Sequence, residues 1–337
     1  MTSHQRTVLV TGGAGYVGAV LCPELIKAGY EVRVLDTCWY GTDVFPSIQN
    51  HPKFDLRVGD IRSSSDVAEA VEGCTDVIHL ACISNDPSYD LDPDLGEDIN
   101  FRAFEPLVSA AKSAGVRRFI YASSSSVYGV KDEERVTEDL ELEPLTDYSR
   151  FKALCETILK SYADDSFTTT TIRPATVCGF SPRQRLDLVV NILVNHAVHN
   201  GSIRVFGGEQ FRPNLHIDDM CRAYLHVLNE PDDRVQGKVY NVGGINHTVT
   251  ELADIVRENV PRATTVAVEP TDDKRSYRIS SEFILSDLGF APAKGVSDAV
   301  KDLVEAFAKG LIPNSFDDAK YVNIKKMNEL ISETSTD

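Results

Sequence analysis

The sequence predicts an α/β protein: a doubly wound parallel sheet with a smaller, interleaved C-terminal domain. Short β-branched runs alternate with helical periods through the first 180 residues, which is typical of a parallel sheet covered on both faces. After Arg173-Pro174 the alternation loosens and the strands become shorter. The length of 337 residues agrees with about two structural units, at roughly 150 residues per domain.

The elements of the first half follow from local patterns. Val8-Leu9-Val10 has the character of a buried strand, and the helical spacing after it continues until Gly29. Gly115 marks a second helix end, because glycine readily adopts the backbone conformation of a C-terminal cap. The predicted strands are 8–10, 31–35, 76–81, 116–123 and 167–172, and the predicted helices are 16–27, 66–71, 98–114 and 147–162.

The second half predicts short strands, further helices and a polar C-terminal end that we expect to fray. We expect residues 1–176 to form a cofactor domain, to which the chain returns at about 205–245. Residues 177–204 and 246–320 then form a substrate domain, and 321–337 a tail. The predicted strands are 204–206, 214–217 and 239–242, and the predicted helices are 188–199, 219–228, 249–258, 297–308 and 322–331.

The charge balance excludes several classes of partner. The chain has 34 Lys and Arg against 51 Asp and Glu, a formal net charge of −17. Nucleic acids and anionic membrane surfaces attract clustered cations, so we expect neither as a partner. An anionic small molecule would have to be held by local groups rather than by the overall charge.

The cysteines and the hydropathy pattern bear on location. Seven cysteines are scattered without a Cys-x-x-Cys pair, as in a reduced intracellular protein. No signal peptide is evident, and no apolar run approaches the roughly 20 residues of a membrane span. We therefore expect a cytoplasmic protein.

A glycine-rich turn joins the first predicted strand to the first predicted helix. Gly12, Gly15 and Gly18 let the backbone approach a pyrophosphate, and the helix N-terminus supplies free N–H groups and positive potential. Asp36 ends the next strand, where a carboxylate accepts hydrogen bonds from the adenosine ribose and repels a 2′-phosphate. The turn contains no Lys or Arg. A Rossmann-type domain that binds NAD rather than NADP is therefore predicted.

Tyr148 and Lys152 are four residues apart in a predicted helix, so their side chains share one face. A phenol with a pKa near 10 is a poor base at neutral pH. A neighbouring ammonium and a positively charged nicotinamide ring favour the phenolate, and lowering the pKa by three units takes about 4 kcal/mol. Tyr-x-x-x-Lys alone is common, but here a serine cluster, Ser123 to Ser126, lies at the end of an upstream strand.

These motifs, in this order, resemble the extended short-chain dehydrogenases/reductases, and more closely the NAD-dependent nucleotide-sugar epimerase/dehydratase family. The resemblance covers about residues 7–310 and implies NAD as cofactor and a nucleotide-diphosphate sugar as substrate. It makes Tyr148 the base that takes a sugar hydroxyl proton, Lys152 the residue that tunes it, and Ser124 the hydroxyl that holds the reacting oxygen. The expected cofactor-binding residues are Gly12, Gly15, Tyr16, Val17, Gly18, Asp36, Asp60, Ile61, Leu80, Ala81, Tyr148, Lys152 and Pro174.

Departures from the family narrow the expected reaction. Similar 4,6-dehydratases have Asp-Glu directly after the catalytic threonine, whereas this chain has Ser125 and Ser126, so elimination of water is not expected. Relatives that epimerise C3 and C5 use a cysteine near the serine segment, and none lies between Cys82 and Cys155. What remains is redox chemistry at C4: epimerisation through a 4-keto intermediate, or net oxidation or reduction.

The resemblance also suggests substrate-binding residues. Arg212 matches an arginine that contacts the nucleotide diphosphate in the family, and Arg275 lies in a region that often supplies a second one. Bidentate guanidinium contacts suit this geometry. The expected substrate-binding residues are Ser84, Asn85, Ser124, Ser125, Asn191, Arg212 and Arg275, with the Arg183-Gln184-Arg185 cluster as a further candidate.

We expect no metal, because neither His216 with Asp218 and Asp219 nor His196 with His199 has a third ligand at supporting spacing. Many relatives form homodimers through two helices per subunit, here 98–114 and 147–162.

The sequence leaves three functions open. The first is a nucleotide-sugar 4-epimerase that retains its NAD. The second is a 4-dehydrogenase or 4-keto reductase that exchanges NADH or reoxidises it with a co-substrate. The third is a non-catalytic dinucleotide-sensing protein, which Tyr148 and Lys152 argue against.

Overall fold

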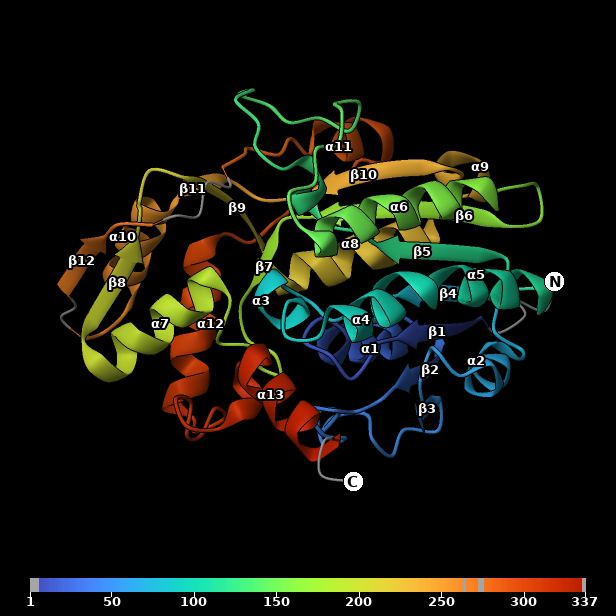
Figure 1. The fold of residues 1–337 in the computed structure, drawn as a ribbon, viewed down its shortest axis with the longest axis horizontal. Helices are drawn as coiled ribbons and strands as arrows, with labels where there is room; N and C mark the ends of the chain where they lie inside the picture. The colour runs from blue at the N-terminus through green and yellow to red at the C-terminus, as the bar shows by residue number, and fades with distance from the viewer. Residues whose placement is uncertain (1–5, 263–264, 272–275, 335–337) are drawn as a thin grey trace.

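The computed structural model describes residues 6–262, 265–271 and 276–334. Its main feature is a seven-stranded sheet in the order β10-β6-β5-β4-β1-β2-β3, with every neighbouring pair parallel (Figure 1). The predicted parallel sheet is therefore confirmed. Its strands are β1 (Thr7–Thr11), β2 (Glu31–Asp36), β3 (Phe54–Val58), β4 (Asp76–His79), β5 (Arg118–Ala122), β6 (Thr168–Pro174) and β10 (Lys238–Val242).

Each face of the sheet has its own apolar core. Alternate side chains of a strand point to opposite faces, so Val8 and Val10 enter one core and Leu9 the other. The first core is completed by α1 (Gly18–Lys27), α8 (Ile217–Asn229) and α11 (Glu282–Leu288). The second is completed by α2 (Ser64–Val71), α5 (Phe104–Ser113) and α6 (Asp147–Ser161). This two-sided burial explains the near-continuous apolar strands of the sequence.

The smaller region, on the left of Figure 1, contains two short sheets and a third core. One sheet has the order β11-β9-β7, and in the other β12 pairs with β8. Its elements are β7 (Thr176–Cys178), β8 (Ser202–Phe206), β9 (Phe211–His216), β11 (Asn246–Thr248), β12 (Thr265–Glu269), α7 (Val189–Asn200), α10 (Val249–Asn259) and α12 (Val296–Ala308). Within the segment at 205–245, β10 joins the large sheet, and α8 and the short helix Asp232–Val235 pack against it, whereas β8 and β9 pair within the smaller region.

Several elements differ from the predictions. Strand β3 was not predicted, because its side chains are only partly buried and its pattern is weak. The predicted helix at 98–114 is a π-helical turn, Asp98–Arg102, followed by α5. Helix α13 (Asn323–Thr334) forms where a helix was expected, and its Met327 is buried in the second core of the large sheet. The remaining short helices are α3 (Asp86–Tyr89), α4 (Pro93–Glu97) and α9 (Asp232–Val235), with 3-10 turns at Ser125–Tyr128 and Ala319–Tyr321.

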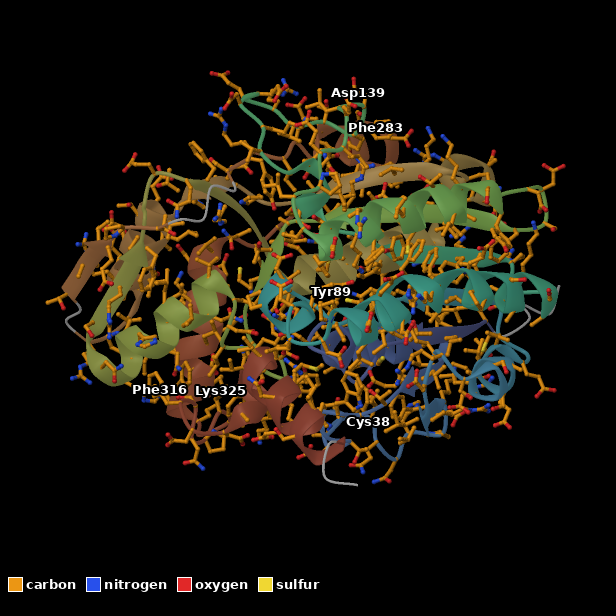
Figure 2. The ribbon with its side chains drawn as sticks, in the orientation of Figure 1. Cys38, Tyr89, Asp139, Phe283, Phe316 and Lys325 are labelled. Atoms are coloured by element: carbon orange, nitrogen blue, oxygen red, sulfur yellow. The ribbon has the colours of Figure 1, made fainter. Side chains whose placement is uncertain are left out.

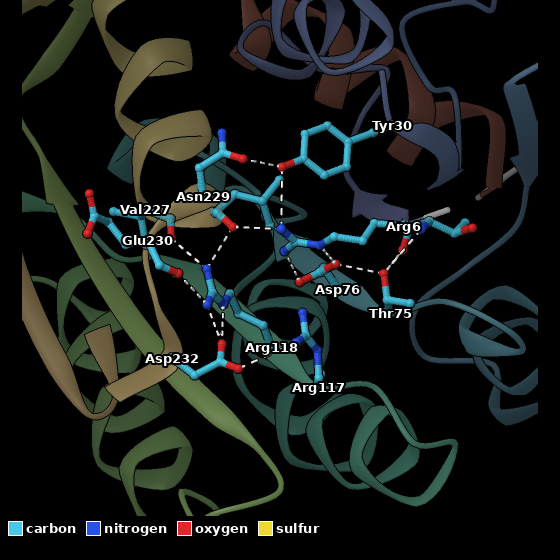
Figure 3. Close-up of polar contacts among 12 residues, drawn as sticks. Arg6, Tyr30, Thr75, Asp76, Arg117, Arg118, Val227, Asn229, Glu230 and Asp232 are labelled. Atoms are coloured by element: carbon cyan, nitrogen blue, oxygen red, sulfur yellow. Dashed lines mark hydrogen bonds and ion pairs between the residues drawn. The ribbon is translucent and has the colours of Figure 1, made fainter. Parts of the chain in front are cut away.

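Two arginines tie the amino ends of the strands to the end of α8 (Figure 3). Arg118, at the start of β5, is 2% exposed and donates 2.7 Å hydrogen bonds to the carbonyl oxygens of Val227 and Leu228. It also pairs with Asp232. These carbonyls belong to the last turn of α8, where backbone acceptors lack partners within the helix. Arg6 likewise forms an ion pair, with Asp76 of β4.

No helix among the described residues is both long and apolar enough to cross a membrane.

Replacing Arg118 with Met should lower the free energy of unfolding by about 3 kcal/mol, since buried carbonyls and a carboxylate lose their donor. Urea unfolding followed by circular dichroism measures this. The adjacent Arg117, whose side chain is 53% exposed, provides the control, and Arg117→Met should change stability by less than about 0.5 kcal/mol. Equal effects of the two substitutions would contradict this role.

Candidate functional site

A cavity of about 370 Å³ opens at the carboxyl ends of the parallel strands. The sheet order reverses between β4 and β1, so loops from these two strands diverge and leave a crevice between them. All thirteen residues expected to bind the cofactor line this cavity. The candidate catalytic residues Ser124, Tyr148 and Lys152 line it as well.

The glycine turn forms one wall of the cavity and has no room for a side chain at Gly12 or Gly18. Gly12 has φ +72°, and a Cβ atom there would lie 2.5 Å from the backbone nitrogen of Ala81. A Cβ on Gly18 would collide with the carbonyl oxygen of Gly13. Helix α1 begins at Gly18, so its first N–H groups face this turn. The turn is therefore shaped for close approach of a phosphate to backbone.

Asp36 lies at the end of β2 with its carboxylate fixed by backbone. Its oxygens accept hydrogen bonds from the N–H groups of Ala14 at 2.9 Å and Cys38 at 2.8 Å. Desolvation raises the pKa of Asp36, while these hydrogen bonds and the charge of Arg183 oppose the rise. Figure 2 shows Cys38 just beyond the end of β2. Each carboxylate oxygen keeps capacity for a further donor, as a ribose hydroxyl requires.

The residues present fit a dinucleotide. The glycine turn leaves room that a Cβ would fill, and Asp36 supplies the acceptor for a ribose. Ile61 and Leu80 add apolar lining to the cavity. Tyr16 has a different place in the wall: its hydroxyl donates to the carbonyl oxygen of Gly179 at 2.7 Å, which joins the turn to the loop after β7.

Helix α6 positions Tyr148 and Lys152. Thr146 and Ser149 form a reciprocal cap that starts the helix at Asp147. One turn later the Lys152 ammonium donates to the carbonyl oxygen of Ala122 at 2.7 Å and lies 5.8 Å from the centre of the Tyr148 ring. Tyr148 and Lys152 therefore share one face of α6, as their spacing in the sequence predicts.

The proton affinity of Tyr148 differs from the expectation. Desolvation in the cavity wall raises the pKa of Tyr148 above its usual value, and the thiol of Cys82 and the carboxylate of Asp86 act in the same direction. The charge of Arg185 and a hydrogen bond with Ser124 lower the pKa, but less strongly. The predicted lowering by Lys152 is therefore not found in the protein alone.

The serine segment contributes hydroxyls and no carboxylate. The Ser124 and Ser126 hydroxyls are 2.9 Å apart, and the Ser125 hydroxyl is 3.3 Å from that of Tyr277. Cys82 lies outside the serine segment, yet it lines the same cavity, so a thiol is present at the site although none lies within that segment. Cys178, in contrast, is buried in the third core.

The expected substrate-binding residues do not all line the cavity. Ser84, Asn85, Ser124 and Ser125 line the cavity. Asn85 has φ +95°, an uncommon conformation for a residue with a side chain, and its amide donates to Asp187 at 3.1 Å. A strained backbone conformation of this kind persists where surrounding contacts hold it, and such conformations cluster at functional sites.

Asn191 and Arg212 lie elsewhere. Asn191 is fully buried behind the wall, where its side chain accepts from the N–H of Gly179 at 3.0 Å and donates to the carbonyl oxygen of Arg185 at 2.8 Å. Arg212 lies on β9 outside the cavity lining, and its guanidinium donates to the carbonyl oxygen of Phe211. Arg275 lies outside the described residues, so its role stays a prediction.

The cavity also has lining residues that the motifs did not indicate. Aromatic side chains come from the segment after β2, from α8 and from the segment before α11, and Asn323 comes from the start of α13. Only Trp39 and Tyr40, three and four residues after Asp36, had a usable signal in the sequence, which is their position near a predicted strand end. These additional residues are Trp39, Tyr40, Tyr224, Tyr277 and Asn323, and the arginine cluster contributes Arg183 and Arg185.

One cluster has metal-ligand character. His216, Asp218 and Asp302 bring a ring nitrogen and two carboxylates together, and Asp302 is a third group that sequence spacing did not reveal. The ammonium of Lys294 bonds Asp218 at 2.6 Å and lies 3.6 Å from Asp302. A cation would have to compete with this ammonium, so we assign no metal to the cluster.

Replacing Gly12 with Ala should weaken NAD binding at least tenfold, because the new methyl group strikes the backbone at Ala81 and distorts the turn. Isothermal titration with NAD measures the dissociation constant. Gly295→Ala is the control, since a Cβ at Gly295 meets nothing closer than 4.0 Å. Unchanged NAD affinity in a folded Gly12→Ala protein would contradict the assignment of the turn.

Known proteins are similar to this chain in sequence and in fold. The profile of the NAD dependent epimerase/dehydratase family matches residues 8–243. The dTDP-glucose 4,6-dehydratase of Streptomyces griseus is 28% identical over 322 residues, which cover 92% of this chain and 95% of that protein.

Two solved structures share the fold over 90% of this chain and 99% of their own. MoeE5 in complex with UDP-glucuronic acid and NAD has a TM-score of 0.78 at 28% identity. UDP-glucuronic acid 4-epimerase from Bacillus cereus, in complex with UDP-glucuronic acid and NAD, has a TM-score of 0.81 at 25% identity. Because the family profile spans most of the chain, this protein belongs to the NAD dependent epimerase/dehydratase family and is an NAD-dependent enzyme.

Proposed function

We propose that the protein is a nucleotide-sugar epimerase that acts by transient oxidation at C4 of a nucleotide-diphosphate sugar. The observation that carries this proposal is the meeting of Ser124, Tyr148 and Lys152 in the cavity whose other wall is the glycine turn. A hydroxyl-handling group and a dinucleotide cradle in one cavity are what alcohol oxidation at a sugar carbon requires. The sugar nucleotides bound by the neighbouring structures support the substrate class.

Each candidate catalytic residue has its own role in the proposed reaction. NAD, when bound, supplies reversible hydride acceptance. Tyr148 takes the proton of the reacting sugar hydroxyl through its phenol oxygen, and Ser124, which hydrogen-bonds that phenol, holds the reacting oxygen. Lys152 is fixed by the carbonyl oxygen of Ala122 and keeps a positive charge beneath the tyrosine ring. When the ketone is reduced from its opposite face, Tyr148 would return the proton to the sugar oxygen, which completes the epimer.

The raised pKa of Tyr148 has a direct kinetic consequence. The base must be ionised, and desolvation opposes ionisation, so cationic neighbours decide how much phenolate forms at neutral pH. Over the neutral range the rate should therefore rise with pH, as the phenolate fraction increases.

Elimination of water is not part of the proposal, although a relative is named as a 4,6-dehydratase. Ser125 and Ser126 stand where the resemblance places the dehydratase carboxylates. Ser125 has Tyr277 as its neighbour and Ser126 has Ser124, so both hydroxyls belong to a neutral network. Neutral hydroxyls are weak general acids and bases at neutral pH compared with carboxyl groups.

We further propose that the chain divides into a cofactor domain and a substrate domain. We also propose that two copies form a homodimer through α5 and α6. Leu154 on α6 is 42% exposed and Leu145 before it is 57% exposed, which suits a helix face covered by a second copy. Light scattering should give twice the mass of 37.1 kDa.

Purified protein incubated with UDP-, GDP-, CDP- and dTDP-sugars should convert one of them to its C4 epimer without accumulating NADH. Product NMR and absorbance at the NADH band, followed together, measure this. Stoichiometric NADH with a keto product would replace the epimerase proposal with a 4-dehydrogenase.

Tyr148→Phe should reduce turnover by at least about a thousandfold while NAD affinity stays within twofold, because only the proton-transfer oxygen is removed. Turnover assays and NAD titration on the same preparation separate the two effects. Tyr162→Phe, at the end of α6 and outside the cavity lining, is the matched control. Undiminished turnover in Tyr148→Phe would refute the assigned base.

A further inference from the structure

The guanidinium of Arg185 lies in the cavity wall with one nitrogen unused. The residue is 8% exposed and lines the cavity together with Tyr148 and Ser124. Its Nε donates to Asp187 at 2.9 Å and its Nη1 donates to the hydroxyl of Ser84 at 3.0 Å. Its Nη2 is buried and has no hydrogen-bond partner among the described residues.

The surrounding contacts explain why Nη2 stays unused. Arginine and carboxylate usually pair through two parallel hydrogen bonds, but Asp187 offers Arg185 only one oxygen. The other oxygen of Asp187 accepts from the side chain of Asn85 at 3.1 Å and from the backbone N–H of Asn323 at 3.0 Å. These contacts hold the guanidinium in place, while its Nη2 donor remains free.

A free donor on a buried cation is costly. Leaving a buried polar donor unsatisfied costs about 1–3 kcal/mol, and more for a charged group, so such an atom in a native site calls for an acceptor. Arg185 supplies the cation, and its fork matches a carboxylate. An anionic oxygen of a ligand therefore fits this position better than a neutral one.

The place of Arg185 in the cavity narrows what the anion is. Its Nη1 bonds Ser84 on the loop after β4, and β4 lies beside β5, whose end leads to Ser124. The charge of Arg185 also lowers the pKa of Tyr148. Arg183, two residues earlier, lies 3.6 Å from the centre of the Tyr40 ring, on the segment after β2, and its charge opposes the rise in the pKa of Asp36. The cofactor diphosphate belongs to the glycine turn. An anion that Arg185 binds therefore belongs to the part of the cavity that Ser84 and Ser124 line.

We infer that Arg185 binds a carboxylate in the sugar subsite, next to the reacting hydroxyl; this rests on the proposed nucleotide-sugar function. The carboxylate has two chemical sources. It is carried on C5 of the sugar, so that the substrate is a nucleotide-linked uronic acid, or it belongs to a separate small carboxylic acid that binds beside a neutral sugar.

The test measures binding to the NAD-loaded protein by titration calorimetry, with probe pairs that differ only at C6. These are UDP-glucuronic acid with UDP-glucose, and GDP-mannuronic acid with GDP-mannose. For the first source, one uronic acid should bind at least tenfold more tightly than its neutral partner. For the second, malonate should bind in the presence of a neutral sugar nucleotide.

Variants assign the effect to Arg185. Arg185→Gln should abolish the tenfold preference or the malonate binding, with NAD affinity within twofold of the original, and Arg185→Lys should retain part of it. Arg204→Ala, whose side chain is 71% exposed on β8, is the matched control. Thermal unfolding shows whether each variant folds, and Arg185→Lys keeps the test open if Arg185→Gln does not.

Three results would overturn the inference. Equal loss of NAD affinity in Arg185→Gln would assign the arginine to the cofactor. Equal loss for charged and neutral sugars would assign it to the nucleotide. Absence of any carboxylate binding that depends on Arg185 would remove the subsite. Failure of the proposed function has a different signature, since no sugar nucleotide would then bind, while the direct malonate titration still tests Arg185.

Discussion

The close approach of Gly12 to the chain after β4 is the constraint on which the site depends. With φ +72° and no room for a Cβ, the turn after β1 runs directly against the backbone of Ala81. This contact sits where the strand order reverses, so the ends of β1, β2, β4, β5 and β6 all face one crevice. A larger residue at Gly12 would push the first turn of α1 away from that crevice, and the phosphate position would be lost with it.

An acidic chain with a net charge of −17 builds a cavity for an anionic ligand by fixing a few cations locally. Lys152, Arg183 and Arg185 line it. Lys152 is held by a carbonyl oxygen, Arg183 by the side-chain amide of Asn323, and Arg185 by a hydroxyl and the largely buried carboxylate of Asp187. Fixed cations in a partly dry cavity interact more strongly with a ligand than surface charges do, because water screens them less. The overall charge therefore says little about the ligand.

Around Tyr148 the structure sets two opposing effects against each other. Desolvation and acidic neighbours favour the neutral phenol, whereas Arg185 and the hydrogen bond with Ser124 favour the phenolate. A base tuned in this way responds to the charge of whatever binds beside it. This links the reactivity of the tyrosine to ligand recognition, since the arginine that acts on the phenol also has a free donor for the ligand.

The sequence by itself determined the parallel sheet, the glycine turn, Asp36 and the pair Tyr148 and Lys152, because these depend on spacing within a single strand, turn or helix. The tertiary structure alone decided which loops reach the cavity. Asn323 enters it from the last helix, and Asn191 turns away from it to brace the loop that carries Arg185. Strand β3 was not predicted because its half-exposed side chains give no clear alternation of polar and apolar residues. Such positions follow from packing between segments far apart in sequence, and no local pattern records that packing.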